Sequence, residues 1–179
     1  MNSSNKRFVF SGGPGAGKTA VLDALAAAGV KCVPEAARML IRQRLDAGLS
    51  PRPEAVEFAR EIFNLDVANY MGAPADEVTI FDRSVVDALA MRKECGDLSD
   101  QELASCLDRY GYNRLAFLFP PWQDIYRQDD ERDQTFAESV AVFDSLKSWY
   151  VGCGYQVVDV PCAAVEERCW FVQQLIDQT

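Results

Sequence analysis

The 179-residue sequence contains no histidine, and its six cysteines form no Cys-x-x-Cys pair. These absences exclude a zinc site of paired cysteine and histidine ligands, and they exclude a histidine general base. The sequence also lacks any apolar run near the roughly 18 residues that a membrane span requires, and its first apolar run is too short for a signal peptide. We therefore expect a soluble cytoplasmic protein that does not partner a membrane.

Positive charge is scarce, with 18 lysines and arginines against 27 aspartates and glutamates and a net charge of -9. The electrostatic field of this net negative charge repels phosphodiester backbones, and no run of basic residues offsets it, so we expect no nucleic-acid partner.

Apolar residues make up 49% of the chain, which is enough to bury one core. The composition favours a single domain over residues 1–179 and leaves the oligomeric state open.

Short β-type runs alternate with longer helical patterns along the chain. Strands are predicted at residues 7–12, 30–33, 77–82, 115–120 and 155–160. Helices are predicted at residues 18–29, 34–48, 50–71, 84–96, 97–111, 137–154 and 166–176. Strands that alternate with helices pair in parallel through right-handed crossovers, so the pattern predicts a three-layer α/β fold.

The segment SGGPGAGKT, residues 11–19, follows the first predicted strand and opens the first predicted helix. It meets the P-loop pattern Gly-x-x-x-x-Gly-Lys-[Ser/Thr] in the context that the mechanism requires. Backbone amides and the helix N-terminus hold the phosphates of a nucleotide there, the lysine reaches the outer phosphates, and the threonine ligates magnesium. The predicted nucleotide-binding residues are Gly12, Gly13, Pro14, Gly15, Ala16, Gly17, Lys18, Thr19 and Ala20.

Two other classes of P-loop protein are disfavoured by what the sequence lacks. A guanine-nucleotide switch carries Asn-Lys-x-Asp and an Asp-x-x-Gly after its third strand, whereas this third strand ends in FDRS and no Asn-Lys-x-Asp occurs. A motor of the AAA+ type carries a helical lid domain after its core, and only about twenty residues follow the fifth predicted strand. We therefore expect neither class.

Charged residues follow the second and third predicted strands, where ligands bind in open α/β sheets. Asp82 is a candidate to position magnesium or accept a proton, and Arg83 to contact a substrate or phosphate; alternatively, Asp82 or Ser84 caps the next helix. Glu35 is a candidate to hold or deprotonate an acceptor hydroxyl, and Arg38, on the same helix face, to neutralise charge. The alternative for Glu35 and Arg38 is an ordinary surface ion pair.

The polar segment 122–134 follows the fourth predicted strand and carries Arg127 and Arg132 among four acidic residues at 129–133. A lid at this place would bring guanidinium groups onto a transferring phosphoryl group. The alternative is a solvated charged loop.

Taken in order, GGPGAGKT, VPEAAR, FDRS and WQDIYRQDDER resemble the small P-loop kinase-like family of single AAA-type domains that includes the ribosylnicotinamide kinase domain. The resemblance implies a five-stranded parallel sheet in the order 2-3-1-4-5, ATP with Mg2+ as cofactors, and a lid with Arg127 as its arginine. Deoxynucleoside kinases are more distantly similar. Their acid in a Pro-Glu context serves as the base, which points to Glu35, and their acid-Arg-Ser triplet corresponds to Asp82, Arg83 and Ser84.

The predicted function is ATP-dependent phosphoryl transfer to a small hydroxyl-bearing metabolite, such as a nucleoside. The predicted catalytic residues are Lys18, Asp82, Glu35, Arg127 and Arg132, and the predicted metal ligands are Thr19 and Asp82. Glu35, Arg38 and Arg83 are expected to bind the acceptor beside a wall of helices at 34–71, with Phe58, Phe63 or Tyr70 as stacking surfaces. Whether Asp82 or Glu35 is the base stays open. The alternative function is an ATP-binding or ATP-hydrolysing regulatory module that acts through a protein partner.

Overall fold

The computed structural model describes residues 5–126 and 135–179. The described strands are β1 (Arg7–Gly12), β2 (Lys31–Val33), β3 (Thr79–Asp82), β4 (Leu115–Phe119) and β5 (Gln156–Asp159). They pair in parallel in the order β2-β3-β1-β4-β5. The predicted P-loop NTPase fold and its strand order are both confirmed.

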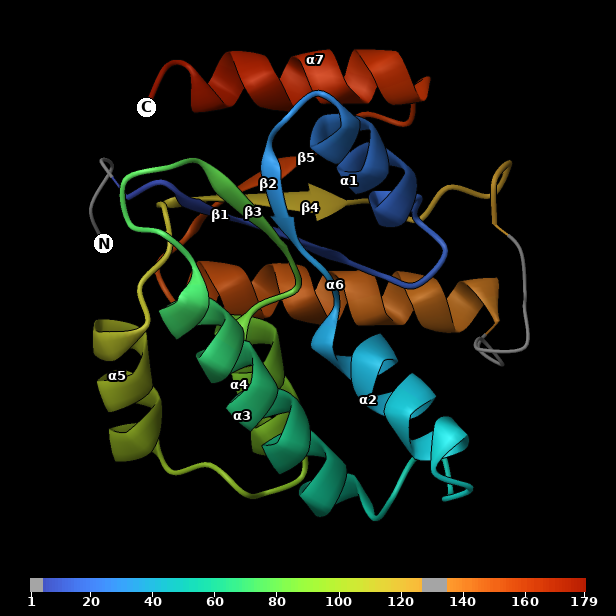
Figure 1. Ribbon diagram of the computed structural model, residues 1–179, viewed down its shortest axis with the longest axis vertical. Helices are drawn as coiled ribbons and strands as arrows, with labels where there is room; N and C mark the ends of the chain where they lie inside the picture. Colours follow the sequence, from blue (N-terminus) through green and yellow to red (C-terminus); the bar gives the residue numbers. More distant parts are fainter. Residues whose placement is uncertain (1–4, 127–134) are drawn as a thin grey trace.

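Helices cover both faces of the sheet (Figure 1). One face carries α1 (Lys18–Ala27) and α7 (Val165–Ile176), and the other carries α6 (Phe136–Gly152) with α4 (Val85–Glu94) and α3 (Ala55–Gly72) beyond it. The remaining helices are α2 (Ala36–Asp46), which follows β2, and α5 (Asp100–Arg109). No helix in the described ranges has both the length and the apolar composition to cross a membrane.

The central strands β1, β3 and β4 are buried on both faces, as their apolar sequences RFVFSG, TIFD and LAFLF dictate. Val9 and Phe10 of β1 are both 0% exposed. Gly12 ends β1 with φ of 126°, and a Cβ there would lie 3.0 Å from the backbone nitrogen of Phe119 in β4. Only glycine fits this close approach, which sets the position from which the P-loop leaves the sheet.

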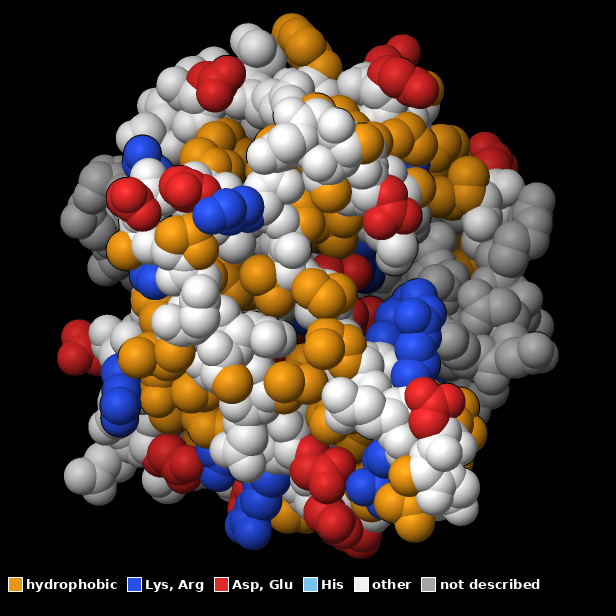
Figure 2. Space-filling model, in the orientation of Figure 1, with side chains coloured by type: hydrophobic (Ala, Val, Ile, Leu, Met, Phe, Trp, Pro, Cys, Tyr) orange, Lys and Arg blue, Asp and Glu red, His pale blue; other side chains and the backbone are white. Residues whose placement is uncertain are grey.

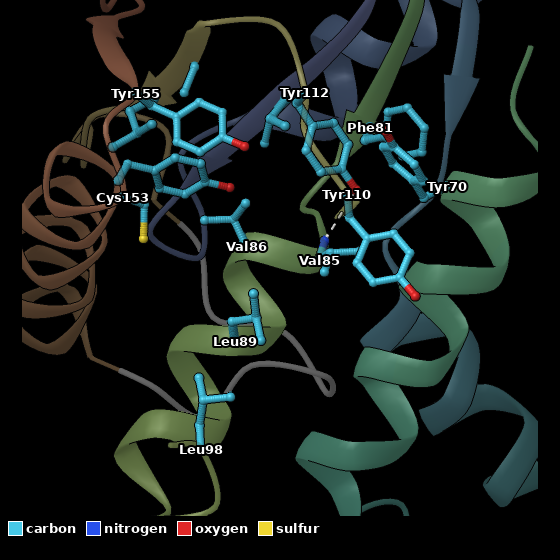
Figure 3. Packing of buried hydrophobic residues seen from close by; sticks show 14 of the residues in the cluster. Tyr70, Phe81, Val85, Val86, Leu89, Leu98, Tyr110, Tyr112, Cys153 and Tyr155 are labelled. Atoms are coloured by element: carbon cyan, nitrogen blue, oxygen red, sulfur yellow. Dashed lines mark hydrogen bonds between the residues drawn. The ribbon is translucent and has the colours of Figure 1, made fainter. Parts of the chain in front are cut away.

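An aromatic cluster connects the sheet to the start of α4 (Figure 3). The ring of Tyr112 lies 5.2 Å from Phe81 and 5.1 Å from Tyr70, in edge-on geometry. Its phenolic oxygen accepts a hydrogen bond from the backbone N–H of Val85 at 3.3 Å. This packing fixes the first turn of α4, which carries charged residues into the site.

Three predicted helix starts are wrong by two to five residues, and one of them is the helix predicted from 97, which begins at Asp100 after its Ser99 cap. The helix predicted from 34 begins at Ala36, because Glu35 has extended φ and ψ of -60° and 120°. The helix predicted from 50 begins at Ala55, so the prolines at 51 and 53 precede it rather than occupy its first turn. Pro53 disfavours helical geometry in the residue before it, and Glu54 caps the helix by accepting from Val56 N–H at 3.0 Å.

Candidate functional site

The P-loop connects β1 to α1 and leaves the helix N-terminus open. Gly17 occupies the N-cap position with φ of 76°, and no side chain caps α1 within the described residues. The first amides of the helix are therefore available to phosphate oxygens. Residues 14–19 line the main cavity, whereas Gly12, Gly13 and Ala20 flank that lining.

Part of the predicted lid packs against this loop. A Cβ on Gly17 would lie 2.9 Å from the side chain of Ile125, and a Cβ on Gly15 would lie 2.6 Å from the ring of Tyr126. Glycine is therefore needed at these two loop positions for packing against Ile125 and Tyr126. Arg127 and Arg132 lie outside the described residues.

Lys18 is buried in the loop, with 7% of its surface exposed. Its ammonium group donates to the carbonyl oxygens of Gly13 at 3.0 Å and Gly12 at 3.5 Å. Burial, and then the nearby guanidinium of Arg83, lower the pKa of Lys18 from its usual 10.5 to about 8, although neighbouring carboxylates oppose this. Among the residues that the structure describes, the Lys18 ammonium hydrogen-bonds to carbonyl oxygens, and a buried cation held in this way is suited to receive a phosphate anion.

The loop opens into a cavity of about 740 Å³ that reaches α2, α3 and α4. This volume lies within the roughly 300–1,000 Å³ typical of small-molecule sites. The side chains that line it beyond the loop include Glu35, Arg38, Ile41, Phe58, Ile62, Asp66, Arg83, Asp87 and Met91. The cavity therefore has a charged end beside the P-loop and an apolar wall beyond it.

Glu35 lies directly before α2 and is held by two arginines. Its carboxylate accepts from Arg38 Nε at 3.0 Å and forms an ion pair with Arg83 Nε at 3.5 Å. Burial acts to raise the pKa of Glu35, but Arg83, Lys18 and Arg38 together hold it below its usual value. Because Glu35 is only 17% exposed and lines the cavity, it is not the ordinary surface ion pair of the alternative interpretation.

Arg83 joins the P-loop to the strand ends. Its φ is 66°, which is uncommon for a residue with a side chain and costs on the order of 1 kcal/mol. One terminal nitrogen donates to the carbonyl of Gly12 at 2.9 Å and the other to Asp87 at 3.1 Å. Burial opposes its charge, but Glu35 and Asp87 raise the pKa of Arg83 above its usual value. The guanidinium is therefore a permanent cation between the loop and Glu35.

Asp82 ends β3 and is 6% exposed, and its Oδ1 atom has no hydrogen-bond partner among the described residues. Burial raises the pKa of Asp82, and Lys18 partly offsets this. Asp82 and Thr19 together line a second cavity of about 320 Å³ between α1 and α2. Figure 2 shows charged side chains in a hollow between these two helices.

The donors at this place fit a magnesium ion. Thr19 lines both cavities, and it shares the smaller one with Asp82, whose Oδ1 atom has no hydrogen-bond partner among the described residues. The described residues hold no group of three or more metal-ligating side chains. Mg2+ beside phosphates needs only one or two protein ligands, with water and phosphate oxygens completing its shell.

Asp87 is a site residue that the sequence analysis missed. It is 4% exposed and accepts hydrogen bonds from Ser11, from Ser84 at 3.1 Å, from Tyr150 at 2.5 Å and from Arg83. Four donors hold this carboxylate in place, and it in turn orients Arg83. The spacing Ser84-x-x-Asp87 at a helix start was a usable signal, since it is typical of a capping box.

The capping alternative for FDRS is confirmed for Ser84, whose hydroxyl accepts from Val86 N–H at 3.1 Å. Asp82 is not the cap. The triplet therefore serves two purposes, because Ser84 starts α4 while Asp82 and Arg83 face the site.

Arg168 in α7 is a second missed residue. It is 4% exposed, and its guanidinium lies 3.4 to 3.5 Å from the carbonyl oxygens of Gly17 and Ala16 and 5.5 Å from the ring centre of Trp122. Burial lowers the pKa of Arg168 below its usual value. The arginine contacts the P-loop but is not among the residues that line the main cavity, and nothing in the local pattern of α7 indicates this contact.

Only one of the three proposed stacking aromatics lines the cavity. Phe58 does so. Phe63 instead packs under Arg92 at 5.0 Å, and Tyr70 donates to the Gly111 carbonyl at 2.9 Å. The expectation is therefore wrong for Phe63 and Tyr70, because they lie on a face of α3 that packs into the protein core.

Three solved structures with a similar fold are named as kinases. Deoxyadenosine kinase from M. mycoides superposes with a TM-score of 0.64 at 10% identity, over 97% of this chain and 100% of that one. Thymidylate kinase from Ehrlichia chaffeensis gives 0.62 at 14% identity, over 97% and 98%. Shikimate kinase from Aquifex aeolicus gives 0.58 at 12% identity, over 96% of both chains. At these identities the likeness shows the fold alone.

No curated protein matches the sequence. The sequence profile of the AAA domain family matches residues 7–168, which is most of the chain. This range includes the P-loop, both charged strand ends and Arg168. The resemblance to a family of single AAA-type domains is thereby confirmed, and the chain belongs to the AAA domain family.

Proposed function

We propose that this protein is a single-domain phosphotransferase that moves the γ-phosphoryl group of ATP to a hydroxyl of a small, nucleoside-like metabolite. One observation carries the proposal: a single cavity joins the P-loop to Glu35 and Arg83 and continues along an apolar wall. A protein that only hydrolyses nucleotide has no need of an acceptor pocket. The neighbouring folds, named as kinases of deoxyadenosine, thymidylate and shikimate, support the same reaction type.

In the proposed reaction, the acceptor hydroxyl oxygen attacks the γ-phosphorus while the bond to the bridging oxygen of the ADP leaving group breaks. The hydroxyl proton passes to a carboxylate. Glu35 suits this role better than Asp82, because Glu35 lines the main cavity whereas Asp82 lines only the smaller one. Orientation contributes more than basicity here, since little deprotonation is needed in a loose phosphoryl-transfer transition state.

The cations around the loop supply charge neutralisation. Lys18 and Arg83 are both anchored by loop carbonyls, so they are positioned before nucleotide binds. When bound, Mg2+ supplies further positive charge at the phosphates, and Thr19 and Asp82 are the residues that would hold it. Asp87 acts indirectly, because it accepts a hydrogen bond from Arg83 and so holds the guanidinium of Arg83 in place.

The reaction is tested by incubating the protein with Mg2+, ATP and a panel of nucleosides and other hydroxyl-bearing metabolites. Mass spectrometry should find one panel member heavier by a phosphoryl group, with ADP formed in equal amount. ADP and inorganic phosphate without any phosphorylated acceptor would contradict the proposal. That result would instead support the regulatory module that hydrolyses ATP and acts through a protein partner.

Asp82→Asn should raise the Mg2+ concentration needed for half-maximal transfer by about tenfold, which is the lower range for losing a supporting group at a metal site. ATP affinity measured with the metal saturating should change little, because the P-loop is intact. The measurement is a Mg2+ titration of the initial rate. The matched control is Asp23→Asn, a carboxylate on α1 that borders the same smaller cavity. An equal response in both variants would remove the special role of Asp82.

A further inference from the structure

Asp66 is a buried carboxyl group that the proposed reaction does not use. It lies in α3 on the face that lines the main cavity, one and two helical turns after Ile62 and Phe58. It is 5% exposed, yet it forms no hydrogen bond or ion pair with any residue of 5–126 or 135–179. Asp87, the other buried carboxylate of the cavity, has four donors. Burying a carboxyl group without a hydrogen-bond partner costs folding free energy. We therefore expect the hydrogen-bond partner of Asp66 to belong to a bound ligand.

The surroundings of Asp66 indicate the shape of that partner. The same cavity is lined by apolar side chains, several of them from the three helices α2, α3 and α4. These are Ile41 of α2, Phe58 and Ile62 of α3, and Ala88 and Met91 of α4. An apolar cavity with an aromatic side chain and one hydrogen-bonding group suits a planar heterocycle. The ring would pack against the apolar side chains, and the atoms along one of its edges would form hydrogen bonds with the polar group. Glu35 and Arg83, at the P-loop end, are left to hold the hydroxyl-bearing part.

We propose that Asp66 recognises the acceptor by hydrogen bonding to the edge of a nucleobase or a nucleobase-like ring. This inference rests on the proposed function, because it names the substrate class that the same cavity would take. It assigns Asp66 to specificity, whereas Glu35 and Arg83 serve the transfer itself.

The protonation state of Asp66 decides which edges it can bind. The charged and titratable groups that face it are Asp87 of α4, Glu35 before α2, Asp82 and Arg83 at the end of β3, and Tyr112 before β4. Burial, followed by the negative charges of Asp87 and Glu35, raises the pKa of Asp66 well above its usual value, and Arg83 only partly opposes this. The neutral acid carries an O–H donor beside a carbonyl acceptor. It therefore complements a ring nitrogen beside an amino group, or a carbonyl beside an N–H.

Substitution by asparagine separates this form of recognition from the binding of a cation. Asparagine also presents a donor beside an acceptor, but it carries no charge at any pH. Asp66→Asn should keep nucleoside affinity within about threefold of wild type near neutral pH, while Asp66→Ala should lose about tenfold or more. The ratio of wild-type to Asp66→Asn affinity should fall as pH rises, because only the wild-type group ionises. Comparing the two proteins at each pH cancels the titration of Lys18, which both share.

Stability gives a readout that needs no ligand. A carboxyl group whose pKa is raised by folding costs stability as pH rises from its unfolded value to its folded value. Asp66→Asn should therefore melt at a higher temperature than wild type at neutral pH, and this advantage should shrink toward pH 4. Asp66 is thus predicted to make the protein less stable at neutral pH than asparagine would at the same position. A residue with a purely structural role would show the opposite, since its replacement would lower the melting temperature.

The experiment is calorimetric titration of adenosine, cytidine, guanosine and uridine into the full chain, with Mg2+ and a non-hydrolysable ATP analogue present. Wild type, Asp66→Asn, Asp66→Ala and the control Glu94→Gln are compared; Glu94 borders the same cavity but is exposed. The inference is overturned if no nucleoside binds, if Asp66→Ala binds as wild type does, or if Asp66→Asn loses as much affinity as Asp66→Ala. Binding that depends on Asp66 without any transfer would refute the proposed function and leave the inference standing.

Discussion

Replacing Lys18 by methionine should remove most of the thermal stabilisation that Mg2+ and ATP give to the protein. At 100 times its dissociation constant, ATP adds about 2.7 kcal/mol to the unfolding free energy, or roughly 5–10 °C for a chain of this size. Losing a buried contact between charged groups costs about 2.8 kcal/mol, a hundredfold in affinity. At the same ATP concentration the variant would gain only about 0.4 kcal/mol, or about 1 °C.

The empty Lys18→Met protein should be at least as stable as wild type. The pKa of Lys18 falls to about 8 in the folded protein, mainly because burial removes water from the ammonium group and so destabilises its charged form. Because this pKa lies below its unfolded value of 10.5, the lysine costs stability at neutral pH, and that cost diminishes as pH rises from about 8 to 10.5. The free energy of unfolding of wild type should therefore rise relative to that of Lys18→Met as pH increases from about 8 to 10.5. Methionine keeps most of the side-chain length without the charge.

The measurement is a set of thermal melts with and without Mg2+ and ATP. Lys93→Met is the matched control, because Lys93 is an exposed lysine of α4 that pairs with Asp100 and lines neither cavity. If Lys18→Met kept the full ATP-dependent shift, Lys18 would have no role at the phosphates. A lower melting temperature of the empty variant would contradict the cost assigned to the buried charge.

The fold could be predicted because its signals are local. The apolar runs of the central strands, the glycine-rich loop and the helical spacing after it each lie within about a dozen residues, where sequence periodicity is informative. The strand order was implied by a resemblance rather than by periodicity. The helix starts at 36 and 55 were missed because tertiary placement of Glu35 and the restriction imposed by Pro53 decided them.

The charged strand ends were predictable because parallel strands place their carboxyl ends along one edge. The neighbouring positions of β2, β3 and β1 in the sheet bring Glu35, Asp82 and Gly12 together. Arg168 was missed because its partners are distant in sequence, and the position of Asp87 in the site likewise depends on two distant donors, Ser11 and Tyr150, besides the local signal from Ser84. Ser11 and Asp87 are 76 residues apart, and Arg168 and Ala16 are 152 apart. The one local signal for Asp66 was an acid amid the apolar positions of a helix, and its meaning depends on a cavity that periodicity does not show.

Glu35→Gln should slow phosphoryl transfer by about a hundredfold or more, the usual range for a positioned proton acceptor. Glu35 is ionised at neutral pH because Arg83, Lys18 and Arg38 outweigh its burial, and it lines the cavity next to the P-loop. Glutamine keeps the shape but cannot take up the hydroxyl proton, and it removes the negative charge that pairs with Arg38 and Arg83. ATP affinity should change less than tenfold, because the loop contacts remain.

Single-turnover transfer from ATP to the identified acceptor separates these effects, with rates normalised to the folded fraction. That correction matters because the lowered pKa of Glu35 means that it stabilises the protein above its unfolded pKa and loses this contribution as pH falls through its folded pKa. The stability gap between wild type and Glu35→Gln should therefore narrow in acid. Glu61→Gln is the control, since Glu61 also pairs with an arginine, Arg44, but lies outside both cavities. If Glu35→Gln transferred normally while Asp82→Asn failed even with saturating Mg2+, the proton acceptor would be Asp82 instead.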